Sequence, residues 1–129
     1  MTPHRILGLN ALVTAGGALG MLATRGTLYT FFGLETSTLL DVLAVALLAY
    51  AGLLWLATRR TISRHTLMTF TAADALWVMA SVVVLVMFWG QFDAIARLLI
   101  IAVAIIVEVF ATLQYRAAGR VVGGFPQMA

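Results

Sequence analysis

Two carboxylates in long apolar stretches are the residues of this sequence with the clearest capacity for chemistry. Asp74 lies in "TAADALWVMAS", residues 71–81, and Glu108 lies in "IAVAIIVEVFATLQY", residues 101–115. Two carboxylates that lie close together in a medium of low dielectric constant cannot both ionise at low cost, so such a pair can share a proton. The pair is therefore a candidate proton or binding site, and equally a candidate polar contact that holds helices together.

The sequence around both acids is that of a membrane protein. The chain of 129 residues is 63% hydrophobic and 10% charged, and its mean hydropathy is +1.05, far outside the balance of a soluble domain. Apolar stretches recur at residues 6–24, 38–58, 66–89 and 95–115. Each approaches the roughly 20 residues that a helix needs to cross a hydrocarbon core. We expect an all-α membrane protein, a single domain over residues 1–129 that forms a four-transmembrane-helix bundle.

The arginines predict the topology. Two of the eight flank one side of the four expected spans, and six flank the other: Arg25 and Arg97 against Arg5, Arg59, Arg60, Arg64, Arg116 and Arg120. Because basic residues accumulate in cytoplasmic loops, we expect both termini and the loop 59–65 to be cytoplasmic. Anionic headgroups attract such arginines, so the expected partners are membrane lipids and not nucleic acid.

Two terminal segments need separate treatment. The first apolar stretch follows "TPHR", and we count it as a retained span and not as a signal peptide. The tail, residues 116–129, contains paired glycines and a proline, and we expect it to be flexible.

Counting along the expected helices places the two acids at similar depth. Asp74 lies ten residues after Arg64, or about 15 Å along the helix, and Glu108 lies eight residues before Arg116, or about 12 Å. We therefore expect both carboxylates inside the bundle and within reach of each other, directly or through one water. Residues on the same helix faces complete a predicted intramembrane polar cluster, a candidate binding or proton site: Asn10, Asp74, Trp77, Ser81, Glu108, Thr112 and Tyr115.

An alternative places Asp74 at a helix start. Thr71 precedes it by three residues, as in a capping box, so the third helix could begin there, with residues 72–92 as the span. The apolar character of residues 66–70 favours the buried position instead. Asp41 and Asp93 stand where the second and fourth helices should begin, and we expect both to stabilise helix starts, with Arg97 facing Asp93 one turn on.

The first span contains a GxxxG motif formed by Gly16 and Gly20. Such spacing lets another helix backbone approach closely. We expect the motif to pack inside the protein, and a dimer contact is the alternative. The connection at residues 25–37 is the longest expected between spans, and its aromatic residues suit a membrane interface.

Motifs for enzymatic chemistry are absent from the sequence. Cysteine does not occur, and His4 and His65 stand beside arginines without ligand spacing, so we expect no metal and no cofactor. No GxSxG, P-loop or HExxH pattern occurs, and we do not expect an enzyme.

Four segments carry a resemblance: "LGLNALVTAGGALG", "FFGL", "ADALWVMASVVVL" and "ATLQYRAAGR". In this order they resemble a pattern that recurs among small uncharacterised bacterial four-span integral membrane proteins. The resemblance implies four helices in a bacterial inner (plasma) membrane, with Asp74 and Trp77 as part of the pattern. It implies no known activity.

Two functions from different classes follow. The first is a small non-catalytic integral membrane protein, an accessory or structural/interaction subunit in which a buried polar clamp holds helices together, within a homo-oligomer or a larger membrane complex. The second is a small proton- or cation-coupled transporter that uses Asp74 and Glu108. We favour the first, because interhelical polar contacts are common and no motif specific for transport is present.

Overall fold

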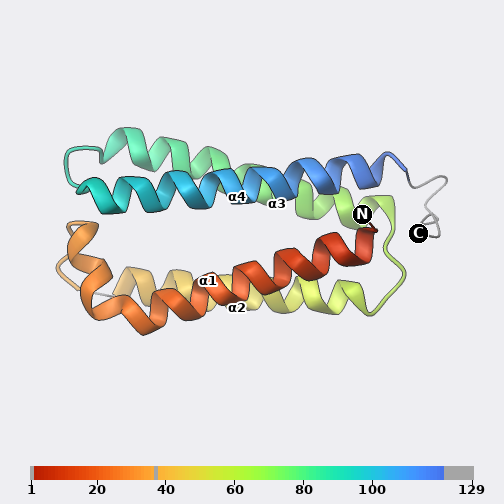
Figure 1. Ribbon diagram of the computed structural model, residues 1–129, viewed down its shortest axis with the longest axis horizontal. Helices are drawn as coiled ribbons and strands as arrows, with labels where there is room; N and C mark the ends of the chain where they lie inside the picture. The colour runs from red at the N-terminus through yellow and green to blue at the C-terminus, as the bar shows by residue number, and fades with distance from the viewer. Residues whose placement is uncertain (1, 37, 121–129) are drawn as a thin grey trace.

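The computed structural model describes residues 2–36 and 38–120. Within them it contains four α-helices and no strand: α1 (Pro3–Phe31), α2 (Thr38–Thr58), α3 (Arg64–Met87) and α4 (Ala94–Ala118) (Figure 1). All four are long and apolar enough to cross a membrane. The prediction of an all-α protein with four helices long and apolar enough to span a membrane is therefore confirmed. Most of the predicted tail, residues 121–129, lies outside the described residues.

Side-chain oxygens cap the starts of α1, α3 and α4. Thr2 accepts a hydrogen bond from the Arg5 amide at 3.1 Å, and Ser63 accepts one from the Thr66 amide at 3.1 Å. Asp93 accepts from two amides of the first turn of α4, at 3.0 and 3.2 Å. These bonds satisfy amides that have no partner within their own helix. The predicted cap at Asp93 is thus confirmed.

The third helix begins well before Asp74. Ser63 caps it, and Thr71 donates to the Leu67 carbonyl oxygen at 2.8 Å within the same helix. Asp74 is consequently an interior residue of α3, with 3% of its surface exposed. This confirms the buried position and rules out the alternative helix start at Thr71.

The first helix is longer than its predicted span. It has 29 residues, or about 44 Å, and it includes residues 25–31 of the segment expected to be a connection. Figure 1 shows that its last turns bend away from the line of the preceding ones. Near this bend the Thr24 hydroxyl donates to the Gly20 carbonyl oxygen at 2.8 Å, a bond from i to i−4 of the kind that bends helices.

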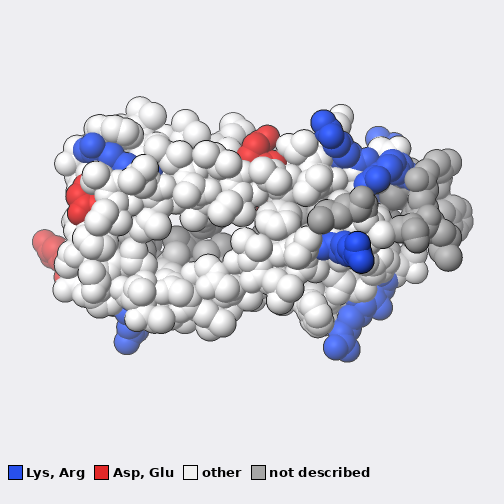
Figure 2. All heavy atoms as spheres, in the orientation of Figure 1, with Lys and Arg blue, Asp and Glu red and all other residues white. Residues whose placement is uncertain are grey.

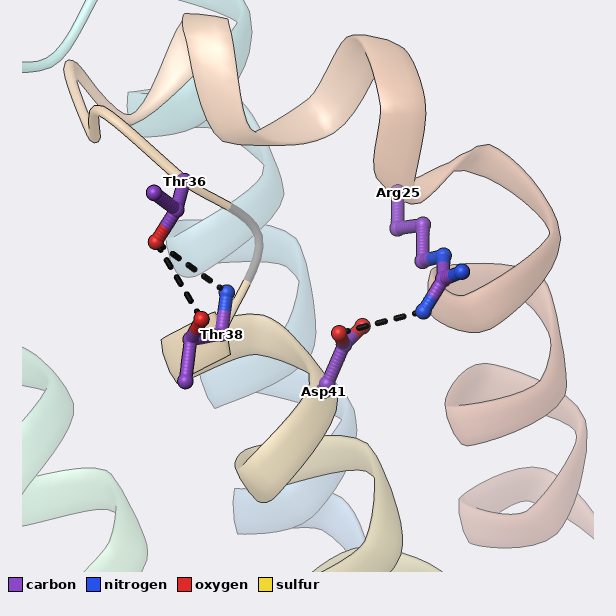
Figure 3. Close-up of polar contacts among 4 residues, drawn as sticks. All are labelled: Arg25, Thr36, Thr38 and Asp41. Atoms are coloured by element: carbon purple, nitrogen blue, oxygen red, sulfur yellow. Dashed lines mark hydrogen bonds and ion pairs between the residues drawn. The ribbon is translucent and has the colours of Figure 1, made fainter.

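An ion pair links α1 to the start of α2. Arg25 Nη1 lies 3.1 Å from Asp41 Oδ2, and the carboxylate stands in the first turn of α2 (Figure 3). Just before this turn, the Thr38 amide and the Thr36 hydroxyl oxygen are 3.5 Å apart. Asp41 therefore has the structural role expected of it, with Arg25 as an additional partner that the sequence pattern did not indicate.

The four helices form two antiparallel hairpins (Figure 1). One consists of α1 and α2 and the other of α3 and α4, and α1 also packs against α4. The apolar core lies at the end where residues 2–6 and 116–120 meet the loop between α2 and α3; its fully buried large side chains include Ile6, Leu7, Leu54, Ile62 and Leu67. The hairpins are thus packed together most closely at this end of the bundle.

At the opposite end, the two hairpin loops contact each other directly. Gln91 Nε2 donates to the carbonyl oxygens of Phe32 and Gly33, at 3.1 and 3.3 Å, and the rings of Phe32 and Phe92 meet edge to face at 5.5 Å. Gly33 has a φ of +69°, and a Cβ there would lie 2.6 Å from Gln91 Cγ, so this loop contact requires glycine. Arg97 does not face Asp93 as predicted, because its guanidinium stacks on Trp89 at 4.2 Å and donates to the Trp89 carbonyl oxygen.

The GxxxG glycines lie on the surface. Gly16 and Gly20 are exposed, and a Cβ built on either would meet nothing within 4 Å. The prediction that they pack inside the protein is wrong, because α1 turns a different face, with Asn10 and Ala18, toward its neighbours. The alternative, a contact between copies, stays a prediction.

Candidate functional site

Asp74 is buried and is the centre of a polar cluster. The Oδ2 atom of its carboxylate accepts from Asn10 Nδ2 at 3.1 Å and from Gln114 Nε2 at 3.0 Å, and Oδ1 accepts from the Tyr50 hydroxyl at 2.7 Å. Asn10 belongs to α1, Tyr50 to α2, Asp74 to α3 and Gln114 to α4. We call these four residues the four-helix cluster. Each helix contributes one member, so the hydrogen bonds join both hairpins.

The remaining oxygens of the cluster are also engaged. Asn10 Nδ2 donates a second bond to Gln114 Oε1 at 2.8 Å, and Asn10 Oδ1 accepts from the Thr14 hydroxyl at 3.1 Å. Every carboxylate and amide oxygen of the four-helix cluster therefore accepts at least one hydrogen bond. A polar group in an apolar interior is costly only when it lacks such partners, so the cluster can stabilise the bundle.

Small and apolar neighbours bring the four side chains within reach of one another. Ala11, Ala51 and Ala111 are buried close to cluster members in the sequence, and small residues let membrane helices approach closely. The ring of Tyr50 packs against Phe70 with centroids 5.8 Å apart, which directs its hydroxyl toward Asp74. The local sequence thus fixes both the spacing of the helices and the direction of the donors.

The four-helix cluster contains two of the seven predicted site residues, Asn10 and Asp74. Ser81 donates to the Trp77 carbonyl oxygen of its own helix at 2.8 Å, and the buried indole nitrogen of Trp77 has no hydrogen-bond partner within the described residues. The other three predicted residues, all on α4, are exposed: Glu108, Thr112 and Tyr115.

The expected contact between Asp74 and Glu108 is not formed. Gln114, and not Glu108, is the residue of α4 level with Asp74. Glu108 precedes Gln114 by six residues, which corresponds to about 9 Å along the helix and to a direction roughly 120° away around it. The prediction of equal depth was wrong because Arg64 and Arg116 do not lie level: counted from the level of the four-helix cluster, Arg64 is ten residues away and Arg116 only two.

Sequence reasoning missed two members of the four-helix cluster, Tyr50 and Gln114. A signal existed for Tyr50, the most polar side chain of residues 42–57 and nine residues, or about 14 Å, from Arg59. Gln114 stands two residues from Arg116, where a polar side chain would ordinarily reach the interface, and its complete burial follows only from the packing of α4. No comparable sequence signal identifies it.

Neither histidine has the surroundings of a metal ligand. His4 Nε2 lies 3.2 Å from the Arg60 carbonyl oxygen, a contact that links the start of α1 to the loop between the hairpins. In residues 2–36 and 38–120, no three His, Asp or Glu side chains are grouped so that they could hold a metal ion.

Replacing Tyr50 by Phe tests the contribution of one cluster bond. The change removes only the hydroxyl that donates to Asp74 at 2.7 Å, so we expect the free energy of unfolding in mild detergent to fall by about 1 kcal/mol. Tyr115→Phe is the matched control, because Tyr115 is 61% exposed and should lose nothing measurable. Equal effects of the two substitutions would contradict the assignment of Tyr50 to the site.

Comparison of the chain with protein-family models, with curated proteins and with solved structures found no match.

Proposed function

We propose that this chain is a small non-catalytic integral membrane protein, an accessory or structural subunit whose four-helix cluster clamps its two hairpins together. One observation carries the proposal: a single buried carboxylate accepts hydrogen bonds from residues of all three other helices. Polar side chains that bond across helices are a general means of holding membrane bundles together.

The same geometry gives less support to a proton- or cation-coupled transporter. A carboxylate that carries a proton or cation must exchange its partners during transport, and Asp74 is buried with three donors already on its two oxygens. The transporter hypothesis also used Glu108 as a second acid, and Glu108 lies about 9 Å further along the bundle. We therefore propose the clamp as the role of Asp74.

A flux measurement tests this proposal. The chain is reconstituted in liposomes that contain a pH-sensitive dye, and a pH gradient is imposed across the membrane. We expect the gradient to decay at the same rate with the parent chain, with Asp74→Asn and with no protein. A faster decay with the parent that both Asp74→Asn and Glu108→Gln abolish, while circular dichroism shows both variants folded, would establish the transporter instead.

We further propose that the protein lies in a bacterial inner membrane with both termini in the cytoplasm. The arginines support this orientation, since Figure 2 shows the basic side chains gathered toward the two ends of the molecule. The end with the chain termini carries six and the opposite end two. The larger number is expected on the cytoplasmic side, next to anionic headgroups.

Single cysteines test this topology, because the chain has none of its own. Glu35→Cys and Thr61→Cys place one thiol in each type of loop, and both positions are exposed. In intact cells, a membrane-impermeant maleimide should label the Glu35→Cys variant and leave the Thr61→Cys variant unlabelled until the membrane is opened. The reverse labelling pattern would show that the topology is the opposite of the one proposed.

A further inference from the structure

A groove with one carboxylate lies between α3 and α4. Its volume is about 400 Å³, and its lining is apolar apart from two side chains, with Val78, Ser81 and Leu85 from α3 and Ile101, Ile105 and Glu108 from α4 among the lining residues. Exposed acidic atoms are visible midway along the molecule in Figure 2. None of the lining residues belongs to the four-helix cluster.

Glu108 stands in the apolar middle part of α4. It is the fifteenth of the 25 residues of α4, eleven residues from Arg97 and eight from Arg116. It is exposed, and no hydrogen bond or ion pair engages its carboxylate within residues 2–36 and 38–120. Acidic side chains at such depth ordinarily face a partner that satisfies them, and the residues that the structure does not describe have no basic side chain, so we expect the partner of Glu108 to lie outside this chain.

A second copy of this chain cannot supply a cation at that depth. The chain has no lysine, and its eight arginines and two histidines lie near helix ends or in loops. A parallel copy would place one Glu108 against another, and an antiparallel copy would also present an apolar middle. The charge complement must therefore come from a different molecule.

The groove presents acceptors and no polar donor. Ser81 uses its hydroxyl hydrogen for the Trp77 carbonyl oxygen at 2.8 Å, so its remaining lone pairs are available only to accept. Glu108 in its ionised form also accepts only. An ammonium or guanidinium group, which donates only, is the matching chemistry, and the surrounding valine and isoleucine side chains match an apolar helix.

We propose that the α3–α4 groove seats a transmembrane helix of another protein that carries a lysine or arginine near the middle of its span, paired with Glu108. This goes beyond the clamp proposed for the four-helix cluster, because it names a second site and the chemistry of its partner. The two proposals rest on different residues and can fail independently.

Synthetic transmembrane peptides test the proposal in lipid vesicles. Three leucine–alanine helices carry an acceptor dye and differ at one position: a central lysine, a central leucine, or a lysine moved four residues toward one end. The chain carries a donor dye on a cysteine introduced by Thr61→Cys. We expect energy transfer to show that the parent binds the central-lysine peptide about tenfold more tightly than the other two.

Two variants identify the residue responsible. Glu108→Gln should reduce binding of the central-lysine peptide to the level of the leucine peptide, and it should leave the fold intact because the side chain is exposed. Glu35→Gln, which neutralises another exposed acid, should keep the full preference.

Four results would overturn the proposal. The first is equal binding of the three peptides by the parent. The second is a preference for the central-lysine peptide that persists in Glu108→Gln. The third is Glu108-dependent energy transfer between copies of the chain without peptide, which would make a second copy the occupant. The fourth is Glu108-dependent binding of tetraphenylphosphonium without any preference among the peptides, which would assign the groove to a small organic cation.

Discussion

Asp74→Leu should lower the free energy of unfolding by about 2 to 5 kcal/mol. Leucine resembles aspartate in shape, so the loss comes from the hydrogen bonds and not from a cavity. It leaves Asn10, Tyr50 and Gln114 without the acceptor to which all three donate. Interhelical bonds in membranes average only about 0.6 kcal/mol when measured pairwise, but an unpaired buried donor costs about 1 to 3 kcal/mol.

Asp74→Asn is the matched control and should cost less than about 1 kcal/mol. The amide oxygen can accept from Asn10 and Gln114 in place of Oδ2. The amide nitrogen would then face Tyr50, whose hydroxyl can accept that bond while donating to the Phe70 carbonyl oxygen, 3.5 Å away. The bond between Tyr50 and residue 74 would reverse its direction, and the Tyr50 hydroxyl hydrogen would turn to the Phe70 carbonyl oxygen.

Unfolding in mixed micelles of mild and denaturing detergent, followed by circular dichroism, compares the two variants. A loss with Asp74→Asn as large as that with Asp74→Leu would show that the negative charge itself, and not the hydrogen bonding, determines stability. The clamp would then need an electrostatic explanation.

The four apolar helices were predictable from the sequence because a lipid bilayer determines the length and composition of the helices that cross it. A bilayer core demands about 20 apolar residues per helix, and such stretches are visible without any structure. The residues at which the helices end were less predictable where a helix continues beyond the length needed to cross the hydrocarbon core of a bilayer. Residues 25–31 extend α1 although they include Arg25, which the helix accommodates through its ion pair with Asp41.

The candidate site was only partly predictable, because the sequence of an apolar membrane helix does not reveal which face of the helix is turned toward the other helices. In a soluble helix the polar side faces water, whereas α4 carries exposed isoleucines and valines toward lipid and buried alanines toward its neighbours. Depth counted from arginines was the remaining guide, and it placed Glu108 opposite Asp74. Asn10 and Asp74 are the two predicted residues that the four-helix cluster contains, and both are polar residues within long apolar stretches.

The prediction for Glu108 shows the same limitation of reasoning from the sequence. The rule that intramembrane acids face the bundle interior predicted a buried position, but the residue is exposed in the single chain. The rule and the structure agree if the relevant bundle includes a helix from another protein, as we propose for the α3–α4 groove.

Replacing all four side chains of the four-helix cluster at once should lower the free energy of unfolding far less than replacing Asp74 alone. We consider a chain with Asn10→Leu, Tyr50→Phe, Asp74→Leu and Gln114→Met, in which apolar side chains of similar size replace the four-helix cluster. No cluster donor or acceptor would then remain unpaired, and Thr14, which donates to Asn10 Oδ1 in the parent, can turn to a carbonyl oxygen of its own helix. Replacing a complete buried polar group by well-packed apolar side chains is often neutral or stabilising.

The free energy of unfolding of this four-site variant, measured beside Asp74→Leu in the same micelles, tests most directly whether the four side chains act as one clamp. We predict that the four-site variant is at least about 2 kcal/mol more stable than Asp74→Leu, although it carries three further substitutions. A four-site variant that is less stable than Asp74→Leu, by the sum of the losses of the other three single substitutions, would show that the residues act independently and would contradict the clamp.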